Sequence, residues 1–281
     1  MNIIIQDIRK GMKSNLYRYL IGIIFVVAVI LLFNKNIVLE MRYNKQISMP
    51  GILDNILYLL CGMTEYIPTS GKPFELPYVW MAIQFLCSFL VFNYMQRDLE
   101  GMGLEILIRS KSRKVWWLSK CIWNVITIIS FYIVIYALAL VLSIIYTGGK
   151  VGFEPSIFLK YMMIPIDRVN IQRFTILLLL VPLLTSIALS LAQMSFSIIV
   201  GPILSLMSIM IIDVFSAYFM NPVLVANYSM VMRSRILIRN GISPLICIIV
   251  DILLIIISIY LGGFIFRKKD IIENNGGSYE N

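Results

Sequence analysis

Long runs of apolar residues alternate with short charged segments or segments rich in Gly and Pro along this chain. A helix needs about 20 apolar residues to cross the hydrocarbon core of a bilayer. The pattern therefore predicts an all-α integral membrane protein, a single transmembrane domain over residues 1–281. Six spans are expected at about residues 16–34, 77–95, 116–146, 174–193, 196–213 and 245–266.

The fourth and fifth of these spans come from one uncharged run, residues 174–212, which is about two span lengths long. We expect the chain to turn back near Gln193 and Ser195, which gives a tight hairpin of two helices. Gly201-Pro202 would then lie inside the fifth span and kink it.

Residues 214–232 are also uncharged and have two interpretations. They could form a seventh span, which would place the basic C-terminal tail outside the cell. Asn221-Pro222 and Asn227 would interrupt such a helix, and the tail would violate the positive-inside rule. We therefore expect a short re-entrant or interfacial element on the outer face, before the last span.

Composition and charge narrow the class of protein further. Hydrophobic residues make up 59% of the chain and charged residues 14%, which excludes a soluble enzyme of this size. The net charge of +9 is attributed to cytoplasmic loops rather than to nucleic-acid binding. With the N-terminus inside, 13 of the 24 basic residues fall in the short inner segments, which favours an N-in, C-in topology.

The N-terminal segment carries two expectations. Ile4, Ile5, Ile8 and Met12 recur at helical spacing, which predicts an amphipathic helix lying in the inner interface against anionic membrane lipid. A frayed cytoplasmic tail is the alternative. The following span is read as a retained helix rather than a signal peptide, because no small-residue cleavage site follows it, and Arg18 is expected to snorkel to the membrane surface.

The inner segment 96–120 is the most informative stretch of the chain. Leu104, Leu107 and Ile108 fall on one helical face, and Glu105 and Arg109 are spaced for an i,i+4 pair. This pattern predicts a short cytoplasmic helix that docks onto a partner, while an ordinary positive-inside loop remains the alternative. Lys120, at the start of the third span, is expected to snorkel inward.

Enzyme motifs are missing from the chain. It has no phosphate-binding GxxxxGK[ST] loop and no histidine, which excludes an ATPase site of its own, a Ser-His protease and an HExxH metal site. No catalytic residue, metal ligand or cofactor of the chain itself is therefore predicted. A paired-aspartate protease would need Asp213 and Asp251, but neither lies in a glycine-flanked motif.

Asp251 lies within the last predicted span, where a carboxylate is costly and by default faces a bundle interior or a water-filled cavity. It is a candidate structural carboxyl, a candidate pathway residue or a partner for a cation. Asp213 is expected at the end of a helix.

The order of these elements resembles the permease subunits of type-two ATP-binding-cassette exporters, the ABC-2 type family. The loop after the second span matches the family pattern at Glu100, Gly101, Arg109, Ser112, Arg113 and Lys120. The last span ends in Gly262-Gly263 and the basic tail Phe266-Arg267-Lys268-Lys269-Asp270, as such permeases often do. The long first outer loop and the extended third helix depart from the family pattern.

The resemblance implies an exporter that moves an amphipathic or hydrophobic substrate, such as a peptide, across a bacterial plasma membrane. Two permease subunits, identical or different, would pack together, and each would dock onto a separate ATPase subunit that binds ATP and Mg. The residues assigned to this coupling are Glu100, Leu104, Glu105, Leu107, Ile108, Arg109 and Arg113. The alternatives are a non-transporting membrane protein that acts by binding, such as an immunity or sensor subunit, and an intramembrane enzyme.

Overall fold

The computed structural model describes residues 3–44, 47–68, 71, 73–101 and 112–268. Within these ranges the chain is helical without a β-strand, which confirms the all-α class. Five stretches are long and apolar enough to cross a membrane: α2 (Leu16–Tyr43), α4 with α5 (Tyr78–Leu99), α7 (Arg113–Thr147), α9 (Ile171–Val200) and α11 (Pro244–Lys268). They make this a multi-pass membrane protein by length and composition.

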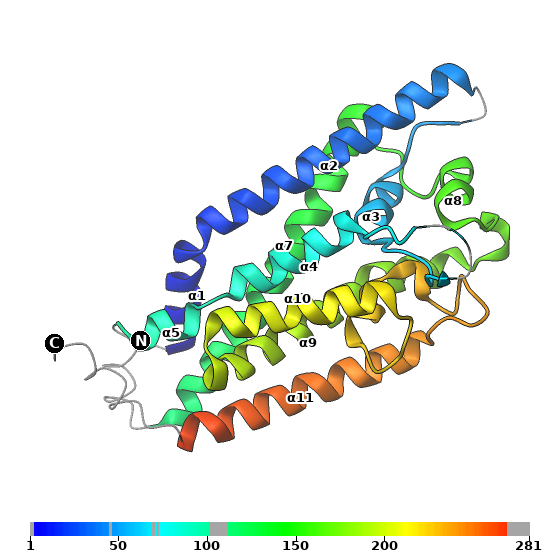
Figure 1. Cartoon of the computed structure of the whole chain (residues 1–281). Coiled ribbons are helices and arrows are strands. Elements are labelled where there is room, and N and C mark those ends of the chain that lie inside the picture. Colours follow the sequence, from blue (N-terminus) through cyan, green and yellow to red (C-terminus); the bar gives the residue numbers. More distant parts are fainter. Residues whose placement is uncertain (1–2, 45–46, 69–70, 72, 102–111, 269–281) are drawn as a thin grey trace.

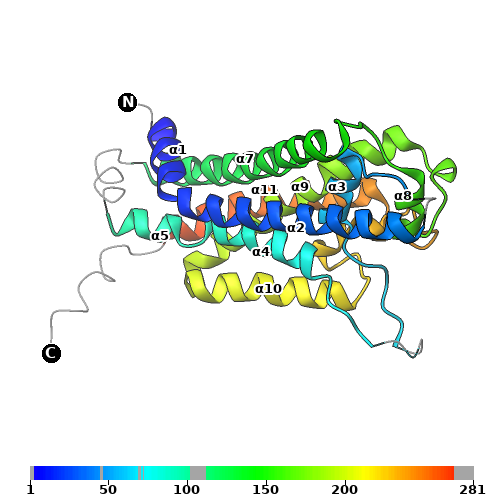
Figure 2. The ribbon, with the colours of Figure 1, turned by 90° about the horizontal axis from the view of Figure 1, so that it is seen from above.

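The long helices lie side by side and run between two ends of the molecule (Figures 1 and 2). The first end holds α1 (Ile3–Ser14), α5 (Tyr94–Leu99), the start of α7 and the end of α11, and is called the α1 end. The second end holds α3 (Ile52–Leu60), α8 (Pro155–Met162) and residues 219–243, and is called the α8 end.

Helix α9 occupies the centre of the bundle and packs against α11, α10, α7 and α4. Helix α11 approaches α7 closely because Gly262 has no side chain: a Cβ atom there would lie 2.3 Å from the Trp117 ring. The opposite face of α11 is exposed and apolar, from Leu245 to Phe264. Such a face suits contact with lipid rather than water.

The hairpin of the uncharged run turns at a different place from the one predicted. Helix α9 continues through Gln193 to Val200, and α10 (Pro202–Tyr218) begins directly after Gly201. Gly201 has a positive φ of 86°, which glycine tolerates, and Pro202 suits a first helical turn because it lacks an N–H. Gln193 does not end the helix, because its side chain is buried and donates to the Ser88 carbonyl at 3.2 Å.

The second predicted span is divided in two. Helix α4 (Tyr78–Val91) ends before Asn93, whose φ of 53° is left-handed, and α5 follows. Arg18 is buried rather than at the surface, and its guanidinium donates to the Leu90 and Phe92 carbonyls and to the Asn93 side chain. The broken helix is thus capped by a cation that sequence reasoning placed at the membrane surface.

Residues 219–243 form no α-helix, so the seventh span is absent. They contain two short 3₁₀ turns, η3 (Val225–Ser229) and η4 (Val231–Arg233), and η3 is largely buried against α9 and α10. Residues 214–218, counted with this segment from the sequence, belong to α10.

Two loops at the α8 end are joined by Asp54 at the start of α3. Its Oδ2 atom accepts hydrogen bonds from the backbone N–H groups of Gly51, at 2.8 Å, and Glu154, at 2.9 Å. Burial raises the pKa of Asp54 to about 7.

Candidate functional site

Lys120 forms the centre of a buried charge cluster at the α1 end. Its side chain is fully buried, and its Nζ atom lies 2.6 Å from Asp7 of α1 and 2.6 Å from Asp98 of α5. One ammonium group on α7 therefore joins three helices. The expectation that Lys120 snorkels to the surface is wrong, because two carboxylates meet it inside the protein.

Two further side chains complete the cluster. The Ser119 hydroxyl donates to Asp7, and Lys10 lies 2.7 Å from the second oxygen of Asp98. Lys10 is partly exposed, whereas the two aspartates are nearly fully buried. Two cations thus balance two anions, which limits the cost of burying charge in a medium of low dielectric constant.

Aromatic rings enclose the buried ammonium group. The Lys120 Nζ atom lies 4.7 Å from the centre of the Trp116 ring and 5.1 Å from that of Tyr94, within the range of cation–π attraction. The Tyr94 ring stacks on Trp123 at 3.8 Å, and the Tyr94 hydroxyl donates to the Asp7 carbonyl. These rings keep water away from the ion pairs and so strengthen them.

Helix α1 packs on the bundle through a stripe of polar and small residues beside the apolar Met12. Asp7, Gly11 and Asn15 follow one another at i, i+4 and i+8 and are all buried, while Ile5 is exposed. A Cβ atom at Gly11 would lie 1.9 Å from the Trp123 indole nitrogen, so glycine is needed for this approach. Asn15 donates to the Leu90 carbonyl at 2.6 Å.

The cluster lies beside the predicted docking segment, residues 104–109 of the inner segment 96–120. Asp98 is one residue before the end of α5, and Arg113 begins α7 on the other side of the segment. Arg113 donates to the Arg267 carbonyl at the end of α11, and Trp117 donates to the Ile259 carbonyl of the same helix. One flank of the segment is therefore tied to α1, and the other to α11.

The structure describes only the margins of the predicted coupling residues. Glu100 is exposed just after α5, and Arg113 lies at the first turn of α7. The remaining five coupling residues, Leu104, Glu105, Leu107, Ile108 and Arg109, lie outside the described residues.

Sequence reasoning missed Asp7 and Asp98 as site residues. Asp7 falls among the polar residues of the predicted amphipathic helix, and Asp98 falls in the inner segment 96–120, so the sequence pattern singles out neither. The i, i+4, i+8 stripe of Asp7, Gly11 and Asn15 was the available signal, since small and polar residues at one helical face favour close packing in membranes.

Asp251 is fully buried on α11, as expected for a carboxylate inside a bundle. Its Oδ2 atom accepts a hydrogen bond from Thr185 of α9 at 2.8 Å, and its Oδ1 atom has no hydrogen-bond partner among the described residues. Asp213 is likewise fully buried, within α10 rather than at its end, and in the part of the chain that the structure describes neither carboxylate oxygen has a hydrogen-bond partner. The two aspartates occupy different helices.

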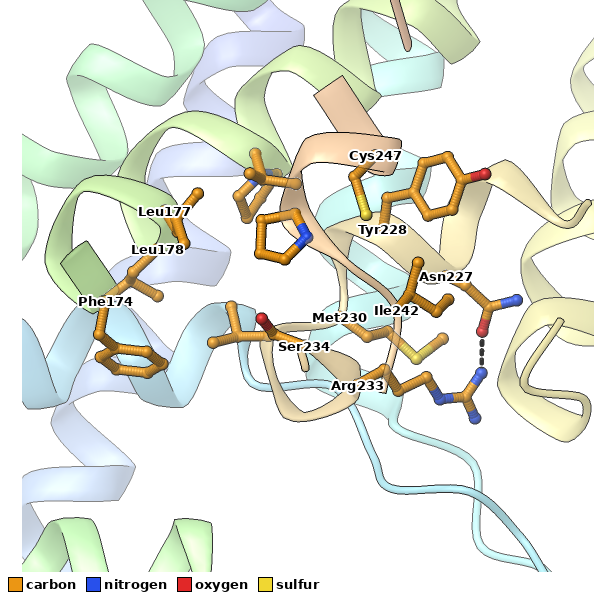
Figure 3. Close-up of a pocket in the computed structure, with 14 residues that line it drawn as sticks. Phe174, Leu177, Leu178, Asn227, Tyr228, Met230, Arg233, Ser234, Ile242 and Cys247 are labelled. Atoms are coloured by element: carbon orange, nitrogen blue, oxygen red, sulfur yellow. Dashed lines mark hydrogen bonds between the residues drawn. The ribbon is translucent and has the colours of Figure 1, made fainter. Parts of the chain in front are cut away.

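The α8 end buries a cation in another way. Arg233 of η4 donates to the backbone carbonyls of Ser216, Ala217 and Phe219 at the C-terminal end of α10, and to the Asn227 side chain. Figure 3 shows the contact with Asn227 beside a small, mostly apolar cavity. Burial lowers the pKa of Arg233 to about 10, so it remains charged at neutral pH.

The cavity in Figure 3 has a volume of about 30 Å³. Its lining consists mainly of apolar side chains of α9, α11 and the η3–η4 segment, including Phe174, Leu178 and Cys247. Within the described ranges, no three His, Cys, Asp or Glu side chains gather as a metal site would require.

The fold and the buried charges define a multi-pass helical membrane protein with a charge cluster at one end. A family model described as "Protein of unknown function (DUF2705)" matches residues 23–272, and the chain belongs to this family. No curated protein and no solved structure matches the chain. The matched region includes all the long helices except the first residues of α2, and excludes α1.

Proposed function

We propose that this protein is the membrane-spanning permease subunit of an ATP-binding-cassette exporter, driven by a separate ATPase subunit. The observation that carries the proposal is the charge cluster around Lys120, which ties both α1 and α7 to the helix that leads into the predicted docking segment. A segment that docks onto an ATPase needs such contacts with the bundle, because a loop without them could not transmit movement of the ATPase to the helices.

The proposed topology has six spans, with the α1 end in the cytoplasm. Helix α10 supplies the fifth span, in addition to the five longer stretches; its 17 residues extend about 25 Å, slightly less than a typical hydrocarbon core. Helix α7 extends about 50 Å and would project beyond the membrane on the cytoplasmic side. Residues 219–243 would be the re-entrant element on the outer side, held in place by Arg233.

Coupling would start at residues 104–109, whose apolar ridge fills a groove on the ATPase. A displacement of this segment pulls Asp98 on one side and Arg113 on the other. The helix is interrupted at the left-handed residue Asn93, so α5 is a separate helix from α4. Movement of α5 would thus reach α1 and α7 through Lys120, and movement of Arg113 would reach α11.

Affinity purification of the tagged full chain from native membranes in a mild detergent tests this proposal. The expected result is co-purification of an ATP-binding-cassette ATPase with the wild-type chain. Leu104→Asp and Glu105→Arg should lose the ATPase while the protein stays in the membrane. Leu76→Asp, which changes an exposed leucine at the α8 end, is the matched control and should retain it.

Recovery of the chain without any ATPase would contradict the exporter proposal and favour the alternative, a non-transporting binding, immunity or sensor subunit. Equal recovery of the ATPase with all three variants would show that docking occurs elsewhere. Reaction of single engineered cysteines with an impermeant thiol reagent tests the topology, and residues of the α8 end should be labelled from outside.

A further inference from the structure

A groove of about 440 Å³ opens at the α8 end between the segment that precedes α4 and the end of α10. Its lining comes from residues 65–68 on one side and residues 218–224 on the other. This volume is within the range of small-molecule sites in proteins. The groove is separate from the charge cluster around Lys120 and from the small cavity of Figure 3.

Aromatic rings form much of this groove and pack against one another. Tyr66, Tyr218 and Phe219 line it, with ring centres 5.2 Å apart for the first pair and 4.7 Å for the second. Phe74 packs edge-on against both tyrosines at 5.2 Å. Rings positioned in advance lose little conformational entropy when a ligand binds.

The groove also carries an acidic group. Glu65 lines it and is exposed, and within the described ranges this carboxylate forms no ion pair. The buried Arg233 interacts with Glu65 only over a distance, because its donors are directed to carbonyl groups and to Asn227. A carboxylate beside several aromatic faces favours an organic cation, since both attract positive charge and the rings accept apolar groups.

We propose that this groove binds a soluble amphipathic molecule through its ammonium group, with Glu65 as the counter-charge and Tyr66, Tyr218 and Phe219 as the aromatic wall. The lining consists of loop residues and a helix end rather than a long lipid-facing helix side. This favours a ligand from water over a lipid headgroup. That the ligand is the exported substrate rests on the proposed function, whereas its binding does not.

Titration of the purified full chain in nonionic detergent with hexyltrimethylammonium, followed by calorimetry, tests the proposal. The expected result is saturable binding of this cation, with hexanesulfonate and 1-heptanol binding at least tenfold more weakly. Binding is measured without an ATPase, so a negative result would leave the proposed coupling untouched.

The variants separate charge from shape. Glu65→Gln should weaken binding of the cation about fivefold to tenfold, the effect of about 1 kcal/mol or slightly more. Tyr66→Leu should weaken it about threefold to tenfold, while Tyr218→Phe, which keeps the ring, should bind like the wild type. Asp167→Asn removes an exposed carboxylate elsewhere on the surface and is the matched control.

Several results would overturn the proposal. Equal affinity for the cation and the sulfonate would remove the role of charge, and an equal loss in Asp167→Asn would remove the role of this site. Unchanged binding of the cation in a Glu65→Gln protein that has wild-type thermal stability would show that Glu65 is not the counter-charge. Mass spectrometry that finds phosphatidylethanolamine, which the probe cannot displace, would identify a lipid as the occupant instead.

Discussion

Among the described residues, Lys120 at the α1 end and Arg233 at the α8 end are both fully buried cations, but different partners satisfy them. Lys120 at the α1 end meets two carboxylates, from helices far apart in the sequence. Arg233 at the α8 end meets mainly neutral carbonyl oxygens at the end of α10. The first arrangement links three separate helices by charge pairs, and the second closes a helix end as a cap does.

This difference has a consequence for how each end responds to change. Removal of one member of a charge cluster leaves an uncompensated charge inside the protein, whereas removal of a capping cation leaves only unpaired carbonyl groups. The α1 end should therefore be more sensitive to single substitutions. It should also be more easily rescued by substitutions that neutralise the remaining charges.

The largest effect is expected for Lys120→Met. This change leaves Asp7 and Asp98 buried without their shared cation and should destabilise the protein by about 3–5 kcal/mol. Thermal unfolding in detergent measures the loss. The triple variant Lys120→Met, Asp7→Asn, Asp98→Asn should recover much of it, and a triple variant no more stable than the single one would contradict the account of charge balance.

Arg233→Met should destabilise the protein less, by about 2 kcal/mol, because the carbonyls of Ser216, Ala217 and Phe219 lose their donor without leaving a charge behind. Arg233→Lys should fall between this variant and the wild type, since an ammonium group cannot reproduce the forked guanidinium contacts. Unfolding curves of the three proteins provide the comparison. A lysine variant as stable as the wild type would show that the fork is dispensable.

Gly11→Ala should have the third largest effect. It should lower the free energy of unfolding by about 1–3 kcal/mol, because the added methyl group crowds the buried Trp123 ring. Limited proteolysis near the N-terminus should become faster as α1 detaches. Gly101→Ala is the matched control, because a Cβ atom there would meet nothing closer than 3.5 Å. Equal sensitivity of the two variants would argue against close packing of α1.

The smallest effect concerns Asp54 at the α8 end. Its pKa rises from 3.8 to about 7 in the folded protein, so the folded state binds more protons than the unfolded state between these values. The protonated Asp54 carboxyl therefore adds to the stability of the folded state below about pH 4, and this stabilisation is lost as the pH rises to 7. Asp54→Asn should flatten the slope of melting temperature against pH over this window, and an unchanged slope would assign it to other groups.

The sequence predicts where the long apolar helices lie along the chain, but it does not predict which side chains contact one another. The third and sixth spans were predicted at 116–146 and 245–266, and the structure has helices at Arg113–Thr147 and Pro244–Lys268. Uncharged length is a local property, and it is enough to identify such helices. The turn between the fourth and fifth spans was misplaced because Gln193 has a polar side chain, yet that side chain is satisfied inside the bundle.

Polar residues near the ends of spans were the main source of error. Arg18 and Lys120 were both assigned to the membrane surface, the default position for long cationic side chains. Their partners, Phe92 for Arg18 and Asp7 for Lys120, are distant in the sequence, so the pattern around each cation does not show which group it meets. The docking residues 104–109 remain a prediction from sequence alone.

Hydrogen exchange of the purified full chain tests most directly the claim that the two ends are held by separate and chemically different contacts. Lys120→Met should speed exchange in α1 and α5 and leave residues 219–243 protected. Arg233→Met should do the reverse, with faster exchange in residues 219–243 and at the end of α10. Faster exchange over the whole bundle in both variants, or no change in α1 on loss of Lys120, would contradict the account.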